Sequence, residues 1–330
     1  MTADAPPAAT TRRLGVAVVG PTAVGKSELA VRLAIALGGE VVNADAMQLY
    51  RGMDVGTAKL PPAERLGVPH HLLDVLDVRD EASVAAYQRE AVRVVGEVAD
   101  RGRVPLLVGG SGLYVAAVLD GLEFPGTDPL VRGALEAELA ERGAPALHAR
   151  LAEVDPDAAA AILPSNGRRV VRALEVVVLT GRPFRATLAL GDPDPSGGTD
   201  GGVESRLLWV RLGLTAPRDR LDARIAERVD RMWSAGLVDE VRALDRAGLR
   251  EGRTASRALG YAQVLRLLDG EVDEGTAREQ VVAATRRLVR RQESWFRRDR
   301  RVRWIDYAGV DGLLSALDAV GAAAAASSAD

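Results

Sequence analysis

The feature that most constrains the fold is one short run of eight residues, GPTAVGKS at positions 20–27. It matches the pattern G-x-x-x-x-G-K-[ST], in which glycines let backbone amides turn inward onto phosphate oxygens and the lysine adds a point charge. An apolar, β-prone run at 14–19 precedes it, and residues 26–37 follow with helical apolar spacing. Strand, glycine turn and helix in this order predict a phosphate-binding loop at the edge of a parallel sheet. The loop predicts a bound diphosphate or triphosphate, but it does not identify the bond that breaks.

Each residue of this loop is a candidate ligand of the diphosphate. The serine hydroxyl at its end is the predicted ligand of a Mg²⁺ cofactor. The predicted diphosphate-binding residues are Gly20, Pro21, Thr22, Ala23, Val24, Gly25, Lys26 and Ser27, with Ser27 also as the metal ligand.

Short apolar runs continue to alternate with helical periodicity beyond the loop. They predict strands at 40–44, 71–78, 104–108 and 207–214, and a helix at 83–100 with Ser83 as its N-cap. This alternation is typical of an α/β fold with a doubly wound parallel sheet. Between about 125 and 190 only helices are expected, which indicates an inserted helical domain. We therefore expect a P-loop α/β core with C-terminal basic helices at 14–124 and 205–308, the insertion at 125–190, and flexible segments at 1–13, 191–204 and 321–330.

Composition excludes several classes of protein. The 330 residues include no cysteine, so disulfides, thiol catalysis and cysteine-ligated zinc are excluded. No apolar run approaches the length of a membrane span, and the N-terminus lacks the apolar segment of a secretory signal. We expect a monomeric cytoplasmic protein with no membrane partner. His70 and His71 are expected to fix a turn after Pro69 rather than to bind metal, because no third ligand lies at metal-site spacing.

The net charge of −3 hides a strongly basic segment. Residues 276–304 hold ten arginines and three acidic residues, a local net charge of +7. Apolar pairs recur there every seven residues, which predicts a packed helix with a basic outer face. Such a face alone is more typical of solvated surface than of an RNA site.

Two polar residues follow predicted strands at the same edge of the sheet as the loop. Asp45 follows the strand at 40–44, and Ser111 lies in the glycine-rich exit of the strand at 104–108. Asp45 is placed to act as a general base, although it also suits a helix cap or an organiser of Mg²⁺ through water. Ser111 is placed to donate to a phosphate oxygen, and simple turn chemistry explains it equally well.

Several distinctive blocks resemble the tRNA dimethylallyltransferase family, which prenylates adenosine 37 beside the anticodon. The first block is DAMQLYRGMDVGTAK at 45–59. The others follow in family order: PHHLLD at 69–74, LLVGGSGLY at 106–114, RRVVRALEV at 168–176, RALGY at 257–261 and TRRLVRRQESWF at 285–296. The resemblance spans about 16–304, and it is to the bacterial form, which lacks a zinc-finger extension.

The resemblance implies that the loop binds the diphosphate of dimethylallyl diphosphate rather than ATP. It implies that Asp45 is the base or orienting group for the exocyclic amine of adenosine 37, that Lys26 acts on the diphosphate, and that Ser111 replaces a usual threonine at the phosphate and the target nucleotide. Ala46, Arg168 and Ala262 depart from the family's usual residues at their positions. The implied contacts with the tRNA anticodon stem-loop are Asp45, Ala46, Met47, Gln48, Ser111, Arg132, Arg168, Arg169, Val170, Val171, Arg172, Arg257, Gly260 and Tyr261.

Three other functions stay open on the sequence. A P-loop kinase of a nucleoside or small alcohol would turn over ATP. A nucleotide-gated RNA-binding protein has the basic helix as its only direct support. Transfer to free AMP, as in related cytokinin-forming enzymes, is disfavoured by the insertion and the basic helix, which a small acceptor does not need.

Overall fold

The computed structural model describes residues 13–184, 207–307 and 312–327. The chain divides into two compact units, one formed by 1–122 and 193–330 and the other by 123–192. The predicted flexible segments lie outside the described residues at 1–12, 191–204 and 328–330, whereas Arg13 begins the first strand.

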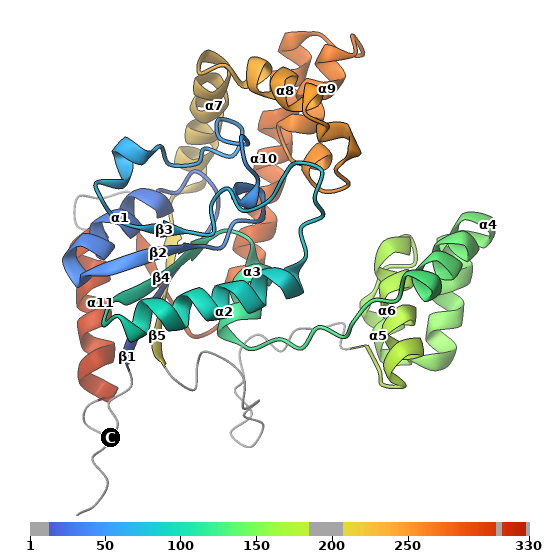
Figure 1. Ribbon diagram of the computed structural model, residues 1–330, viewed down its shortest axis with the longest axis horizontal. Coiled ribbons are helices and arrows are strands. Elements are labelled where there is room, and N and C mark those ends of the chain that lie inside the picture. The colour runs from blue at the N-terminus through green and yellow to red at the C-terminus, as the bar shows by residue number, and fades with distance from the viewer. Residues whose placement is uncertain (1–12, 185–206, 308–311, 328–330) are drawn as a thin grey trace, which may run out of the picture. The chain divides into compact units, whose positions relative to one another are not determined.

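The larger unit is built on a parallel sheet (Figure 1). Among the described residues its strands run in the order β3-β2-β4-β1-β5-β6, and every pair is parallel. The predicted α/β fold with a parallel sheet is therefore confirmed. The strands are β1 (Arg13–Val19), β2 (Gly39–Asn43), β3 (His70–His71), β4 (Val104–Gly109), β5 (Leu207–Thr215) and β6 (Val302–Asp306).

Both faces of the sheet are covered because successive side chains of a strand point to opposite faces. Val16 and Val18 of β1 pack with helices α1 (Lys26–Leu37) and α11 (Gly312–Ser327), while Ala17 and Val19 pack with α2 (Val84–Asp100) and α3 (Gly112–Leu119). This double burial explains why the central strands are continuous apolar runs rather than alternating ones.

A second group of helices in this unit holds the segment that follows β2. Tyr50 and Met53 are fully buried in one apolar cluster with residues of the helices between 218 and 296. The segment 46–59 is thereby fixed beside the carboxyl edge of the sheet. The helices are α7 (Arg218–Ser234), α8 (Leu237–Arg246), α9 (Tyr261–Leu268) and α10 (Glu274–Phe296), and the short 3₁₀ turns are Ala46–Leu49, Pro62–Arg65, Leu249–Glu251 and Ala255–Arg257.

The smaller unit consists of helices in its described residues: α4 (Pro129–Val154), α5 (Pro156–Ala161) and α6 (Gly167–Thr180). Helix α4 is interrupted at Gly143, whose φ of 79° and ψ of 164° are not helical. The core of the smaller unit is an apolar cluster that includes Leu147, Leu151, Val170 and Leu174.

Some local predictions hold and others are wrong. The Ser83 hydroxyl accepts the Ala86 amide at the start of α2, as predicted. The strand predicted at 71–78 ends at His71, because Leu72 and Asp74 adopt left-handed backbone with φ of 60° and 59°. The basic stretch is helical only to Phe296 and then forms β6, and residues 321–327, predicted to be flexible, belong to α11.

No helix in the described ranges combines the length and the apolar character needed to cross a membrane.

Candidate active site

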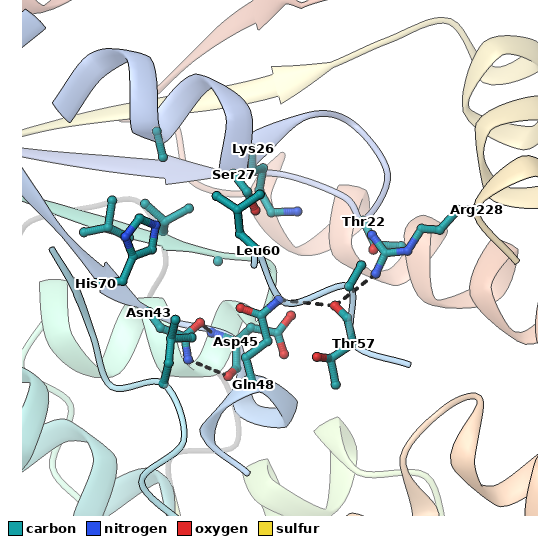
Figure 2. Close-up of a pocket in the computed structure, with 16 residues that line it drawn as sticks. Thr22, Lys26, Ser27, Asn43, Asp45, Gln48, Thr57, Leu60, His70 and Arg228 are labelled. Atoms are coloured by element: carbon teal, nitrogen blue, oxygen red, sulfur yellow. Dashed lines mark hydrogen bonds between the residues drawn. The ribbon is translucent and has the colours of Figure 1, made fainter. Parts of the chain in front are cut away.

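A crevice of about 630 Å³, part of it open to solvent, lies at the carboxyl edge of the sheet (Figure 2). Residues of the phosphate loop, of the segment after β2 and of α7 meet there. The lining residues are Thr22, Lys26, Ser27, Ala30, Val41, Asn43, Asp45, Gln48, Thr57, Ala58, Leu60, His70, Leu73, Val108, Gly109 and Arg228.

The phosphate loop has the backbone that its glycines predict. Gly20 and Gly25 have φ of 138° and 105°, and a Cβ added at Gly20 would lie 2.7 Å from the carbonyl oxygen of Leu214. Lys26 Nζ donates a hydrogen bond to the carbonyl oxygen of Pro21 at 2.7 Å. Burial lowers the pKa of Lys26 to about 8, while the nearby Asp45 carboxylate acts in the opposite direction. A poorly hydrated ammonium in this position interacts strongly with a multiply charged anion.

Asp45 is held by both its backbone and its side chain. The Asn43 side chain accepts from the Asp45 amide at 2.9 Å and donates to its carbonyl at 3.0 Å. Asp45 Oδ1 accepts the Met47 amide at 2.9 Å and so caps the 3₁₀ turn that follows, whereas Oδ2 accepts no hydrogen bond from the residues that the structure describes. The sequence posed a helix cap and a general base as alternatives for Asp45; the cap is present, and the residue also lines the crevice.

Ser111 lies beside Asp45 but does not line the crevice. Its hydroxyl accepts the amide of Ala46 at 3.3 Å. This contact joins the turns that follow β2 and β4, so the structure assigns Ser111 a local structural contact next to the candidate base.

Arg228 is a lining residue that the sequence reasoning missed. Its Nη2 donates to the Thr57 carbonyl at 3.2 Å, and Gln48 Nε2 donates to the same oxygen at 3.2 Å. Burial lowers the pKa of Arg228, and the Asp45 carboxylate raises it. The available signal is its place in α7, three residues after Ile225 and directly before Val229, both buried, since an arginine at that position borders the apolar stripe.

Lys59, whose role the sequence left unassigned, ties the 50–59 segment together. Its buried Nζ donates to the carbonyl of Tyr50 at 2.9 Å and forms ion pairs with Asp54 at 2.6 Å and Asp74 at 2.5 Å. The second lysine of the chain is therefore structural.

The Tyr261 side chain is fully buried and makes a structural contact. Its hydroxyl donates to Glu240 Oε1 at 2.6 Å, and the Glu240 carboxylate accepts the amides of Asp54, Val55 and Gly56 at 3.1, 2.7 and 3.1 Å. The Tyr261 side chain therefore offers no surface to RNA.

The two residues predicted beside Tyr261 differ in exposure. Gly260 is buried, with its amide donating to Gln263 Oε1 at 2.8 Å, whereas Arg257 is exposed.

The RNA contacts predicted on the smaller unit also divide by burial. Val170 and Val171 are 0% and 2% exposed, so their side chains offer no surface to RNA. Both Arg132 and Arg172 pair with Glu175, which is fully buried. Arg172 also donates to the carbonyls of Pro125 at 2.6 Å and Gly126 at 3.1 Å. The two exposed arginines among these predicted contacts are Arg168 and Arg169.

Helix α10 and the turn after it carry a group of exposed arginines, which we call the basic surface. None of them has a carboxylate partner within the described ranges, whereas Arg278, Arg286 and Arg301 do. The basic surface consists of Arg287, Arg290, Arg291, Arg298 and Arg300.

The adjacent histidines make separate contacts. His70 lines the crevice, with its Nδ1 2.9 Å from the Val68 carbonyl, and burial lowers its pKa. His71 Nε2 lies 2.7 Å from a carboxylate oxygen of Glu40. Both belong to β3 rather than to the predicted turn. The described residues hold no group of three or more His, Cys, Asp and Glu side chains arranged to bind a metal ion.

Comparisons with known proteins place this geometry in a family. The sequence profile of the IPP transferase family matches residues 48–299. A tRNA dimethylallyltransferase of Thermobifida fusca is 64% identical over 301 residues, which cover 90% of this chain and 91% of that protein. A second, of Salinispora arenicola, is 62% identical over 94% of this chain and 87% of that protein.

Solved structures give the same result. The tRNA isopentenylpyrophosphate transferase of Bacillus halodurans is similar with a TM-score of 0.70 and 40% identity, over 96% of this chain and 98% of that one. A eukaryotic dimethylallyltransferase acting on tRNA, at 23% identity and a TM-score of 0.73 over 93% of this chain and 77% of that one, shares the fold. On this sequence similarity, with the fold in agreement, the chain belongs to the IPP transferase family.

Proposed function

We propose that the protein transfers the dimethylallyl group of dimethylallyl diphosphate to the exocyclic amine of adenosine 37 in tRNA. The observation that carries the proposal is the meeting of a phosphate loop and the Asp45 carboxylate in one crevice (Figure 2). Relatives that are more than 60% identical carry the name tRNA dimethylallyltransferase, which supports this choice over a kinase.

The best-defined part of the site is the part that would bind the leaving diphosphate. As the bond between carbon 1 and oxygen breaks, its electron pair stays on the diphosphate, whose negative charge grows. The loop amides, the Lys26 ammonium and the Arg228 guanidinium supply fixed positive potential at that end of the crevice. Because they are in place before the reaction, they stabilise the transition state without reorganising.

The other lining residues suit a short hydrocarbon. Ala30, Val41, Leu60, Leu73 and Val108 give the crevice an apolar part beside Lys26 and Ser27. A five-carbon allyl group is removed from water there, which favours its binding and excludes water from the reacting carbon.

Asp45 is the proposed acceptor of the amine proton. The exocyclic nitrogen forms a bond to carbon 1, the diphosphate leaves, and the proton that the nitrogen gives up moves to the carboxylate. Oδ2 suits this role because Oδ1 already holds the Met47 amide and so fixes the orientation of the carboxylate.

The residues present fit a Mg²⁺ ion. The Ser27 hydroxyl lines the crevice and has no hydrogen-bond partner among the described residues, and hydroxyl and phosphate oxygens are the hard ligands that Mg²⁺ prefers. When bound, the ion would neutralise charge on the departing diphosphate.

For the RNA, we propose contacts with the basic surface, Arg257, and Arg168 and Arg169 of the insertion. These arginines are exposed, and phosphate contacts account for much of the affinity for RNA. Adenosine 37 must leave its stack to enter the crevice, at a cost of about a few kcal/mol that is smallest for an unpaired loop base. This substrate places the proposed reaction in the cytoplasm.

The test uses labelled dimethylallyl diphosphate, Mg²⁺ and unmodified tRNA, with Asp45→Asn as the diagnostic variant. Asparagine still caps the 3₁₀ turn but accepts no proton, so we expect turnover to fall by about 10²–10⁴-fold while affinity for diphosphate is retained. Asp100→Asn, an exposed aspartate outside the crevice, is the matched control. If the folded wild-type protein leaves the tRNA unlabelled, the proposed function is refuted. If Asp45→Asn turns over as fast as the wild type, the assignment of Asp45 as the base is refuted.

A further inference from the structure

We propose that Gln292 of α10 is a positioning residue that fixes the phosphate loop for diphosphate binding. Its Oε1 accepts the amide of Thr22 in the loop at 2.9 Å, and its Nε2 donates to the carbonyl of Gly110 at 3.0 Å. One side chain thus joins the loop after β1 to the turn after β4, across 270 and 182 residues of sequence. The inference deepens the proposed function, on which it rests.

Two glycines of the turn after β4 leave the room that this contact needs. A Cβ added at Gly110 would lie 2.4 Å from Nε2 of Gln292, and one at Gly112 would lie 2.2 Å from the Trp295 ring. A larger residue at Gly110 would push the amide of Gln292 aside, and one at Gly112 would collide with the Trp295 ring of α10. The close approach of α10 therefore explains the glycines at 110 and 112, and Gln292 makes its hydrogen bond to the turn at this point.

The phosphate loop has a strained backbone, so a contact from outside the loop is needed to hold its conformation. Gly20, Ala23 and Gly25 all have positive φ, and in Ala23 this conformation is strained. Lys26 holds the loop from inside through the Pro21 carbonyl, next to Thr22. A diphosphate that attracts the Lys26 ammonium competes with that bond, whereas the Gln292 bond to Thr22 faces α10 and persists.

Gln292 is therefore expected to act on diphosphate affinity without touching the diphosphate. Because Gln292 accepts the Thr22 amide, that amide is not available to the diphosphate. Gln292 would instead raise the affinity by holding the other loop amides in a binding conformation. Preorganisation of this kind lowers the entropic cost of binding.

The first experiment measures binding of inorganic diphosphate with Mg²⁺ by titration calorimetry. Gln292→Met keeps the volume and removes both hydrogen bonds. We expect about a tenfold loss of affinity, because a loop without these two bonds would spend only about a tenth of its time in the binding conformation. Gln280→Met, the same change elsewhere on α10, removes a contact with Arg266 and is expected to stay within about twofold of the wild type. Equal affinities in the two variants would overturn the inference.

The second experiment separates positioning from a general loss of structure. In the transfer assay, Gln292→Met should raise KM for dimethylallyl diphosphate about tenfold and leave KM for tRNA unchanged. A parallel rise in both constants would indicate a displaced α10 and contradict the assignment. If Gln292→Met does not fold, Gly110→Ala tests the same contact, because its Cβ forces the amide of Gln292 away. An unchanged KM for dimethylallyl diphosphate in Gly110→Ala would then count against it.

The calorimetric result does not depend on prenyl transfer. A wild type that binds diphosphate but transfers no label would refute the proposed function, and the effect of Gln292→Met on binding would still decide this inference.

Discussion

Neutralising Glu175 is expected to destabilise the smaller unit strongly while leaving the stability of the larger one unchanged. The Glu175 carboxylate is fully buried and pairs with Arg132 and with Arg172, the latter at 2.6 Å. Burial alone would raise its pKa, but the two guanidinium groups hold that pKa below its usual 4.5. Glu175→Gln keeps the shape of the side chain and leaves two cations beside a neutral amide.

The magnitude follows from burial. Removing one partner of a fully buried ion pair costs about 3–5 kcal/mol. The arginine side chains here are 32% and 25% exposed, so water partly compensates, and we expect a loss of about 2–4 kcal/mol. A unit of roughly 60 described residues has a typical free energy of unfolding of about 3–9 kcal/mol. The substitution therefore removes a large share of that stability.

The assay exploits where the tryptophans lie. All four, Trp209, Trp233, Trp295 and Trp304, belong to the larger unit, so tryptophan fluorescence does not report on the helical insertion. Circular dichroism at 222 nm reports on helices of both units. In urea, Glu175→Gln should show an early loss of ellipticity with no matching change in fluorescence.

Arg168→Gln, an exposed change on the same helix α6, is the control and should leave both transitions in place. Coincident, unshifted transitions in Glu175→Gln would refute the ion-pair argument. A fluorescence transition that moves together with the ellipticity would refute the independence of the two units.

Two further predictions concern the larger unit. Since burial lowers the pKa of Lys26 from 10.5 to about 8, its ammonium is charged below that pH and loses its proton above it, so diphosphate affinity should fall as pH rises from about 7 to about 9. Calorimetry at several pH values should show a flatter profile for Lys26→Met, and equal slopes would contradict this assignment. Tyr261→Phe leaves the Glu240 carboxylate with its three amides but without the phenol, and a loss of about 1–2 kcal/mol in urea unfolding is expected with affinity for diphosphate unchanged. A weakened diphosphate affinity at unchanged stability would show instead that Tyr261 acts on the site.

The parts of the site that could be predicted from the sequence are those set by local pattern. The phosphate loop is a contiguous run whose glycines and lysine act within one turn. Asp45 could be placed because it follows a buried strand, and parallel strands bring their carboxyl ends to one edge. Neither inference needs a long-range contact.

Arg228, Gln292 and Glu240 could not be predicted in the same way. Each reaches the site from a helix more than 170 residues away from the backbone group it contacts. Their side chains are of types common on any helix surface. They gain a role only because α7 and α8 pack against the segment after β2 and α10 packs against the phosphate loop and the turn after β4. The sequence of one chain holds no pattern that joins a glutamine in a basic helix to an amide in the phosphate loop.

The arginines show why charge alone does not identify an RNA contact. Arg132 and Arg168 are both basic residues of the insertion, yet the first faces a buried carboxylate and the second faces solvent. A signal was available, because Glu175 is the one acidic residue in the run ALEVVVL, and a lone carboxylate on an apolar helix face needs a cation. The number of arginines available to RNA is therefore smaller than the count in the sequence.

Ion pairs also reduce the number of free arginines in the basic segment at 276–304. Of its ten arginines, Arg278, Arg286 and Arg301 have carboxylate partners, while Arg297 lies over the ring of Trp304. Glu293 of α10 pairs with Arg218 of α7, and Asp222 of α7 pairs with Arg286 of α10, so these two carboxylates do not neutralise the basic surface. A chain with a net charge of −3 can for this reason present a positive surface to RNA, because it is the charge near the phosphates that governs contact.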